Sequence, residues 1–178
     1  ARSVTNNTPD TLPPVFQSAA TNTNGTKVVL TYDEALSATT AAAGDFIVTT
    51  GGNANTVTAV AVSGSTVELT LTNAVAFGQA ATVAYTDPST NNDVNAVQDA
   101  LGNDAATLTE TTVTNNVPDA PSFLSATVSN DGTKLILSYN EPLSATTAAV
   151  GAFNVTTAVS DPNAVTAVAV NGSTVELS

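Results

Sequence analysis

Acidic and amide side chains gather in one stretch of the chain, residues 87–104, which reads DPSTNNDVNAVQDALGND. Carboxylate and amide oxygens are the ligands that calcium prefers in proteins. Asn91, Asp93 and Asn95 alternate as in an EF-hand loop, but Ala96 stands where that loop requires Gly and no Glu follows at its twelfth position. The stretch is therefore not an EF-hand, and calcium would need a different loop geometry here. Its candidate ligands are Asp87, Asp93, Asp99 and Asp104, with Asn103 beside them.

A second acidic group follows the apolar run KVVLTY. It contains Asp33 and Glu34, and a later copy of the segment carries Glu141. Asp10 and Asp119 lie in short proline-containing segments that we expect near these acids. The predicted metal ligands are therefore Asp10, Asp33, Glu34, Asp87, Asp93, Asp99, Asp104, Asp119 and Glu141.

Calcium is one of two interpretations of these acids. In the other, Asp-Pro, Asn-Asn and Gly-Asn are turn-forming dipeptides and the carboxylates are simply solvated. Fifteen acidic residues against three basic ones would then repel one another without compensation. Both interpretations stay open at this point.

The remaining composition argues against catalysis. The chain has no His and no Cys, so it lacks the usual general base and a thiolate nucleophile or zinc ligand. Lys27 and Lys134 could activate a serine, but each starts a strand after a Gly-Thr turn, where a solvated lysine that protects the strand is the simpler interpretation. A carboxylate pair for glycoside hydrolysis would lack aromatic support, because the chain has no Trp. We expect no enzyme.

The charge balance limits the partners. A formal net charge of −12 repels nucleic acid and anionic lipid and attracts cations. No apolar run approaches the roughly 20 residues that a membrane helix needs. We therefore expect neither nucleic-acid binding nor membrane insertion.

The chain repeats itself after about 108 residues. Residues 25–50 return as residues 132–157, and residues 57–69 return as residues 165–177. A fixed period of this length predicts a tandem array of one structural unit. The second copy has no counterpart of residues 71–113, so we expect it to lack its last two strands.

Within one copy, apolar residues alternate with a period of two, which is typical of half-buried strands. Val28, Leu30 and Tyr32 share one face, whereas Ile47 faces outward because the second copy has Asn154 at that position. The other predicted inward residues are Phe46, Val48, Val67, Leu69, Leu71, Ala81, Val83 and Tyr85. Turn dipeptides such as Asn-Gly, Gly-Gly and Ser-Gly separate the runs and favour an antiparallel β-sandwich. We expect seven strands near residues 14–21, 25–33, 45–50, 56–62, 65–72, 80–86 and 105–114.

One segment favours a helix. It is SATTAAAG, residues 37–44, in which Ser37 can cap the first turn and Gly44 can end the last. We expect one or two helical turns there.

These patterns predict four parts of the chain. Residues 1–8 would hold the end of a preceding repeat and a linker, because residues 2–7 align with residues 111–116. Residues 9–114 form a complete repeat, residues 115–121 a linker with two prolines, and residues 122–178 a partial repeat.

The segments NGTKVVLTYDEALSA, VSGSTVELTLTNAVAFGQAATVAYTDP and VQDALGNDAATLTETTVTNNVPDAP together resemble the SWM-type bacterial Ig-like repeats. That family occurs in tandem in very large surface and secreted proteins. The resemblance covers nearly the whole chain, and AVQDALGN before the final strand is its most specific part. It implies all-β, tandem antiparallel Ig-like (Greek-key) β-sandwich domains, of which the second is incomplete here, and no catalytic residues.

Three roles follow as hypotheses. The first is a non-catalytic structural repeat of an extracellular or cell-surface stalk or fibre, with calcium as a stiffening cofactor and neighbouring repeats of the same chain as partners. The second is a filament subunit whose incomplete sandwich is completed by strands from an identical neighbouring chain. The third, an adhesin module, has no aromatic cluster to support it.

Overall fold

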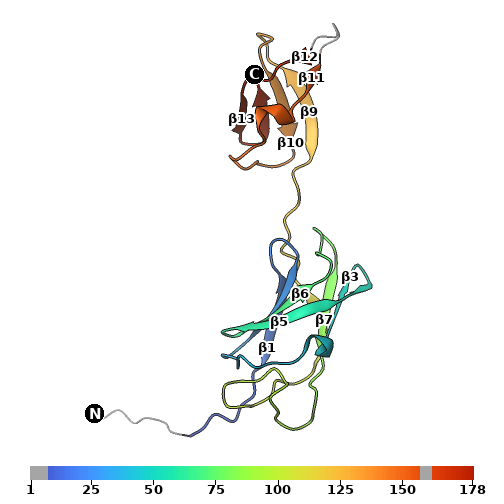
Figure 1. Ribbon diagram of the computed structural model, residues 1–178, viewed down its shortest axis with the longest axis vertical. Helices are drawn as coiled ribbons and strands as arrows, with labels where there is room; N and C mark the ends of the chain where they lie inside the picture. Colours follow the sequence, from blue (N-terminus) through green and yellow to red (C-terminus); the bar gives the residue numbers. More distant parts are fainter. Residues whose placement is uncertain (1–7, 157–161) are drawn as a thin grey trace, which may run out of the picture. The chain divides into compact units, whose positions relative to one another are not determined.

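The computed structural model describes residues 8–156 and 162–178 and divides the chain into two compact units, Ala1–Asp119 and Ala120–Ser178 (Figure 1). The division falls inside the segment 115–121 that the sequence predicts as a linker. The predicted end of a preceding repeat, residues 2–7, lies outside the described residues.

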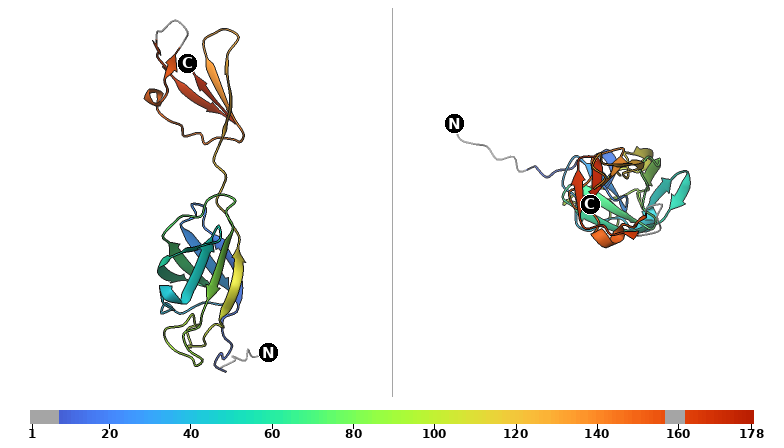
Figure 2. Two further views of the ribbon diagram at one scale, coloured as in Figure 1. Left: turned by 90° about the vertical axis from the view of Figure 1, so that its right-hand side faces the viewer. Right: turned by 90° about the horizontal axis from the view of Figure 1, so that it is seen from above.

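The first unit is a sandwich of two four-stranded antiparallel sheets (Figures 1 and 2). One sheet has the order β1-β2-β6-β5 and consists of Phe16–Thr21, Lys27–Tyr32, Thr66–Leu71 and Val57–Ser63. The other has the order β4-β3-β7-β8 and consists of Asn53–Asn55, Phe46–Thr50, Ala81–Tyr85 and Leu108–Val113. The all-β, antiparallel sandwich class is confirmed, and all seven predicted strands are present.

The core of the first unit follows the predicted alternation. Val28, Leu30, Val67 and Leu69 are completely buried between the sheets, whereas Ile47 is 60% exposed. From the opposite sheet, Phe46 and Tyr85 stack with ring centroids 5.0 Å apart. Burial of these small apolar side chains is the main stabilising contribution, at about 25 cal/mol per Å² of apolar surface.

The helix predicted over residues 37–44 is wrong. The backbone there is irregular and ends in a short 3₁₀ turn, η1 (Ala43–Asp45). Leu36 N–H donates to Gly64 O and Ser37 N–H donates to Gln98 O, so backbone bonds to distant parts of the chain fix the start of this segment. An eight-residue segment has too little intrinsic helicity to compete with these contacts. In the described part of the chain, no helix is long and apolar enough to cross a membrane.

The stretch 87–104 closes one end of the first sandwich. Ala96 and Val97 within it are completely buried. Val97 N–H donates to the Tyr85 hydroxyl at 3.0 Å, and Ala105 N–H donates to Val97 O at 2.7 Å. This acidic loop is therefore anchored in the core at its centre.

The first and last strands of the first unit meet side by side. Ala20 and Thr114 form a parallel bridge, in which Thr21 N–H donates to Thr114 O and Thr114 N–H donates to Ala19 O, both at 2.9 Å. Asn116 N–H then donates to the Thr21 hydroxyl at 2.8 Å. The start of the predicted linker is therefore held on the first unit.

The second unit reproduces one sheet of the sandwich and half of the other. The complete sheet has the order β13-β14-β10-β9, formed by Val168–Asn171, Thr174–Leu177, Leu135–Tyr139 and Phe123–Val128. β11 (Val155–Thr156) and β12 (Pro162–Asn163) pair with each other, as β3 and β4 do, and η2 (Val150–Ala152) precedes them. No described residue takes the places of β7 and β8. Among the described residues of this unit, Val175 and Leu177 alone are buried.

Candidate metal site

Six of the nine predicted ligands meet in two clusters, both in the first unit. One consists of Asp10, Glu34 and Asp99, and the other of Asp87, Asp93 and Asp104. In each cluster one carboxylate oxygen per residue lies within 4.8 Å of the others. Three oxygens so close together could supply part of the coordination shell of a hard cation such as calcium, which also takes backbone carbonyls and water.

The first cluster is organised around Asp99. Its Oδ1 accepts hydrogen bonds from Leu101 N–H at 2.8 Å and Asn103 N–H at 2.9 Å, and Asn103 Nδ2 donates to its Oδ2 at 2.8 Å. Asn103 Nδ2 also donates to Asp10 O at 3.3 Å, which ties the N-terminal segment to the loop. Glu34 follows β2 and completes the cluster. The loop and two separate chain segments thus bring three acids together.

The second cluster lies wholly within the 87–104 loop. Asp93 accepts hydrogen bonds from the Ser89 hydroxyl at 2.6 Å and from Asn95 N–H at 2.7 Å. Asp104 Oδ2 accepts from Asp93 N–H at 2.8 Å. Asp104 Oδ1 is buried and has no hydrogen-bond partner within the described part of the structure. A buried carboxylate oxygen without a donor is costly, and a cation would compensate it.

The pKa values of the acids fall into two groups. Partial burial, followed by repulsion from Asp10, Asp99 and Asp33, raises the pKa of Glu34. Burial also raises the pKa of Asp104, and the charges of neighbouring acids add to this effect.

Asp93 and Asp99 shift in the opposite direction. Hydrogen bonds from Ser89 and Asn95 lower the pKa of Asp93. Burial opposes ionisation of Asp99, but hydrogen bonds from Asn103 and Leu101 outweigh it and lower the pKa of that carboxyl. Each cluster therefore pairs an acid that ionises readily with one that resists ionisation, as expected where negative charges are crowded without a counterion.

Three predicted ligands join neither cluster. Asp33 Oδ1 accepts a hydrogen bond from Val15 N–H at 2.7 Å, and at the matching position of the second unit Asn140 Oδ1 accepts from Ser122 N–H at 2.7 Å. Because a neutral amide performs the same task, Asp33 acts as a backbone cap. Asp119 is exposed, and Glu141 is the second unit's counterpart of Glu34.

The two lysines form ion pairs. Lys27 Nζ lies 2.5 Å from Glu68 Oε2, and Lys134 Nζ lies 2.7 Å from Glu176 Oε2. The Lys134 pair raises the pKa of that ammonium, through its hydrogen bond to Glu176 and the charge of that residue. The same half-exposed pair thus recurs in both units. Because β2 and β10 each lie between two other strands of their sheet, these lysines do not protect a sheet edge.

Sequence reasoning missed Ser89 as part of the second cluster. Its hydroxyl donates to Asp93 and its N–H lies 3.5 Å from Asp87 Oδ1. The signal was the Asp-Pro-Ser turn itself, in which a serine hydroxyl commonly bonds to nearby polar groups.

The architecture defines a tandem β-sandwich repeat protein with acid-rich loops at one end of its first sandwich. Residues 9–90 and 114–178 match the family model of the SWM repeat, described as "Putative flagellar system-associated repeat". These segments make up most of the chain, so the chain belongs to the SWM repeat family, and the resemblance drawn from its motifs is confirmed. No curated protein matches the chain significantly.

Three solved structures are similar, and all are of the S-layer protein SbsC. The N-terminal part of that protein is 22% identical, with a TM-score of 0.48 over 71% of this chain and 31% of that one. A longer form, rSbsC(31-844), is 21% identical, with a TM-score of 0.48 over 85% of this chain and 19% of that one. A structure of domains 1-6 of SbsC is 22% identical, with a TM-score of 0.47 over 71% of this chain and 18% of that one. The chain thus spans less than a third of each of these proteins.

Proposed function

We propose that the chain is a non-catalytic structural segment of a cell-surface or secreted array. The observation that carries this proposal is the repetition itself: the second unit reproduces the first sheet of the first unit strand for strand, and a short proline-containing segment joins them. In such arrays each repeat contacts mainly its neighbours, and stability is approximately the sum of repeat and interface contributions. The partners would be neighbouring repeats of the same chain or identical subunits.

The location can be tested on intact cells of the source organism. Antibodies against the 178-residue chain should label whole cells or the culture medium, and external protease should remove the signal. A cytoplasmic protein measured in parallel must stay protected, which controls for lysis. A signal that appears only after the cells are broken would rule out the surface role.

We further propose that calcium binds the two acidic clusters of the first unit. The support is the convergence of six carboxylates, the raised pKa values of Glu34 and Asp104, and the buried Asp104 Oδ1 without a donor. Because Asp10 lies in the segment that precedes the first sandwich, calcium at the first cluster would fasten that segment to the domain. This is how the metal would stiffen an array.

A calcium titration tests this proposal. Calcium at ten times its Kd should stabilise the first unit by about 1.4 kcal/mol, which corresponds to about 5 °C in Tm for a domain of this size. Glu34→Gln should weaken the first cluster and Asp104→Asn the second. Glu110→Gln is the matched control, because Glu110 is exposed on β8 and belongs to neither cluster. An unchanged Tm at millimolar calcium would refute calcium binding.

The second candidate function is assembly by strand donation between identical subunits. Its support is the half-sandwich of the second unit, in which no described strand covers the apolar side chains as β7 and β8 cover their counterparts in the first unit. Light scattering at high protein concentration tests it, and a strict monomer would refute it. The adhesin role gains no support, because the exposed phenylalanines Phe77 and Phe123 lie in different units.

A further inference from the structure

The chain contains two Asn-Gly dipeptides, Asn24-Gly25 in the first unit and Asn171-Gly172 in the second. Both lie in turns, the first between β1 and β2 and the second between β13 and β14. An asparagine that precedes glycine is prone to deamidation, because glycine has no side chain to keep its backbone nitrogen away from the carbon of the neighbouring amide. The two turns hold this dipeptide in different ways.

The first dipeptide is held at both of the groups that would react. Gly25 N–H donates to Asn22 O at 3.1 Å, and Gly25 O accepts from Val75 N–H at 2.9 Å. Asn24 Oδ1 accepts from the N–H and the hydroxyl of Thr26, at 3.2 and 2.6 Å. Gly25 is also buried. Turning its nitrogen toward Asn24 Cγ would break these bonds, so the folded turn protects Asn24.

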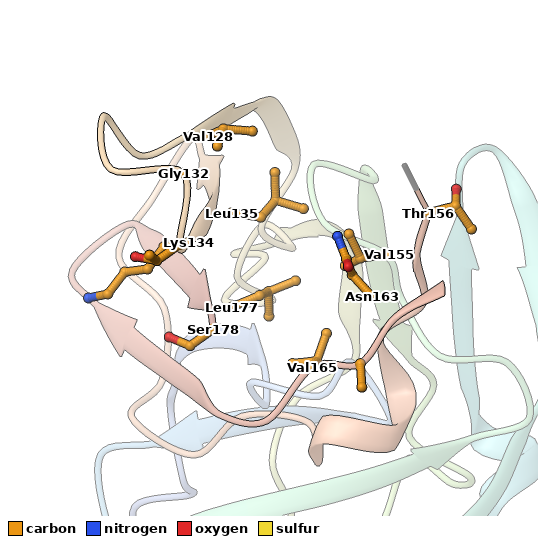
Figure 3. A pocket seen from close by; sticks show the side chains of 12 residues that line it. Val128, Gly132, Lys134, Leu135, Val155, Thr156, Asn163, Val165, Leu177 and Ser178 are labelled. Atoms are coloured by element: carbon orange, nitrogen blue, oxygen red, sulfur yellow. The ribbon is translucent and has the colours of Figure 1, made fainter. Parts of the chain in front are cut away.

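The turn between β9 and β10 is the second unit's counterpart of this one, and it is held in the same way. Figure 3 shows Gly132 in this turn. Gly132 N–H donates to Ser129 O at 2.9 Å. Asp131 replaces Asn24, and its Oδ1 accepts from the Ser129 hydroxyl and from Thr133 N–H. These bonds lower the pKa of Asp131 to about 2, and an ionised carboxylate has no leaving group for ring closure.

Asn171-Gly172 lacks both kinds of protection. Asn171 and Gly172 are exposed, and nothing lies within 4 Å of a Cβ added at Gly172. Hydrogen bonds hold the carbonyl groups alone: Thr174 Oγ1 donates to Asn171 O and Leu143 N–H donates to Gly172 O, both at 2.9 Å. Among the described residues, none bonds to the Asn171 side-chain amide or to Gly172 N–H. The two groups that react are therefore unrestrained.

This exposure belongs to the hairpin and not to the second unit as a whole. The same hairpin joins β5 and β6 in the first unit, with Ser63 and Gly64 at its tip. Thr66 Oγ1 donates to Ser63 O, and Leu36 N–H donates to Gly64 O, as at the matching positions of the second unit. Ser63 and Gly64 are exposed although that sandwich has both of its sheets. Serine carries no amide, so only the second unit has the reactive group here.

We propose that Asn171 is a site of spontaneous deamidation in the folded protein, whereas Asn24 is not. The Gly172 nitrogen attacks Asn171 Cγ and loses its proton to solvent. The C–N bond of the side-chain amide breaks, which releases ammonia and closes a succinimide ring. Water then opens the ring at either carbonyl and gives aspartate or isoaspartate. Water is the only co-reactant, and nothing is oxidised or reduced.

The structure also indicates how the two sites differ in rate. Ring closure at Asn171 requires rotation about its ψ angle and loss of its pairing with Thr174, the last pair of the hairpin. Such end pairs open at little cost, whereas opening at Gly25 disrupts a buried turn. The rate of a reaction that needs an open form follows the population of that form. The isoaspartate product lengthens a two-residue turn and so disturbs the pairing of β13 with β14.

The test follows both dipeptides of the full 178-residue chain by peptide mass mapping during incubation at mildly alkaline pH. We expect the exchange of the side-chain NH₂ for oxygen to proceed at least about tenfold faster at Asn171 than at Asn24. In denaturant the two sites should react at similar rates, because glycine follows both. The folded chain is thus compared with its own unfolded state.

Variants separate the two turns. Asn171→Ser installs the residue of the first unit and should abolish the reaction in the second unit without altering the fold. Thr26→Ala removes a hydrogen bond from Asn24 Oδ1 and should speed the reaction at Asn24 while leaving Asn171 unchanged. Equal rates at the two sites in the folded chain would overturn the proposal. A rate difference that persists in denaturant would also overturn it, because local sequence would then explain the difference.

Discussion

The hydroxyl oxygen of Tyr85 accepts a hydrogen bond from the backbone N–H of Val97 at 3.0 Å, and both residues are completely buried. This bond joins the end of β7 to the centre of the acidic loop. Burial raises the pKa of Tyr85 to about 12, so the hydroxyl stays neutral across the physiological range. Tyr85→Phe should leave the Val97 N–H unpaired and destabilise the first unit by about 1–3 kcal/mol.

Tyr32 provides the matched control. Its hydroxyl is also buried but has no partner in the described part of the structure. Tyr32→Phe should therefore be neutral or slightly stabilising, because it removes a polar group without breaking a hydrogen bond. Chemical denaturation of both variants tests this prediction. Equal decreases in the free energy of unfolding would contradict the assigned role of the Tyr85 bond.

Gly25 is the glycine least tolerant of a side chain. Its φ is 71°, and an added Cβ would lie 2.1 Å from the carbonyl oxygen of Val75, which no local adjustment accommodates. The Val75 N–H also donates to Gly25 O at 2.9 Å, so a shift of that loop would break this bond. Gly25→Ala should destabilise the first unit by about 2–4 kcal/mol.

Gly64 in the β5-β6 turn isolates the steric part of this effect. It has a φ of 61° but nothing within 4 Å of an added Cβ. Gly64→Ala should cost only about 1–2 kcal/mol, the conformational penalty of a left-handed residue. Thermal melts of the two variants give the comparison. If Gly64→Ala lowers the Tm as much as Gly25→Ala does, the proposed clash between the added Cβ at position 25 and Val75 O is contradicted.

The acidic clusters predict opposite pH dependence with and without calcium. Without calcium, the raised pKa values of Glu34 and Asp104 mean that the stability they contribute is lost as pH rises through those values. The Tm of the first unit should therefore rise as pH falls from 7 toward about 4.5. Below that, Asp93 and Asp99 lose their favourable bonds, because their folded-state pKa values are lowered.

With millimolar calcium the dependence of Tm on pH should reverse. Protons compete with the cation for the carboxylates, so calcium-derived stability falls as pH falls. The double variant Glu34→Gln/Asp104→Asn should flatten both curves, whereas Glu110→Gln should change neither. Identical curves with and without calcium would show that the clusters do not bind it.

The second unit should unfold before the first. Within its described residues only Val175 and Leu177 are buried, whereas the first unit has a continuous core from both sheets. Calorimetry should show two transitions, and hydrogen exchange should assign the lower one to β9–β14. A single transition shared by both units would mean that this half-sandwich is stabilised by contacts beyond its own fold.

Alternation along the strands was sufficient to predict most of the fold. Val28, Leu30 and Tyr32 face inward as expected, because a strand with one buried face must place every second side chain in the core. β4 was missed because Asn53 and Ala54 carry no apolar alternation; the strand is fixed by pairing with β3 and by Asn55, whose side chain bonds Asn73. The helix was predicted from local propensity, which long-range backbone bonds override.

The candidate site was only half predictable. Composition and turn dipeptides identified the acids, but no local rule shows that Asp10 and Asp99, far apart in the chain, meet at Glu34. Their meeting depends on Val97 and Gln98 being buried, which draws the loop across the end of the sandwich. Asp33 was included because it carries a charge, and comparison with Asn140 shows that its position requires an acceptor instead.

The parallel bridge between Ala20 and Thr114 has a mechanical consequence. When the two ends of the first unit are pulled apart, β1 is pulled toward its N-terminal end and β8 toward its C-terminal end. Because the two strands run parallel where they meet, the hydrogen bonds of Thr21 and Thr114 are loaded along the strand direction. Bonds loaded in this direction must break together, whereas an antiparallel hairpin pulled from its ends opens one bond at a time. Asn116 adds its own bonds to Thr21 at the same point. The first sandwich therefore resists tension in shear, at the place where the linker leaves it.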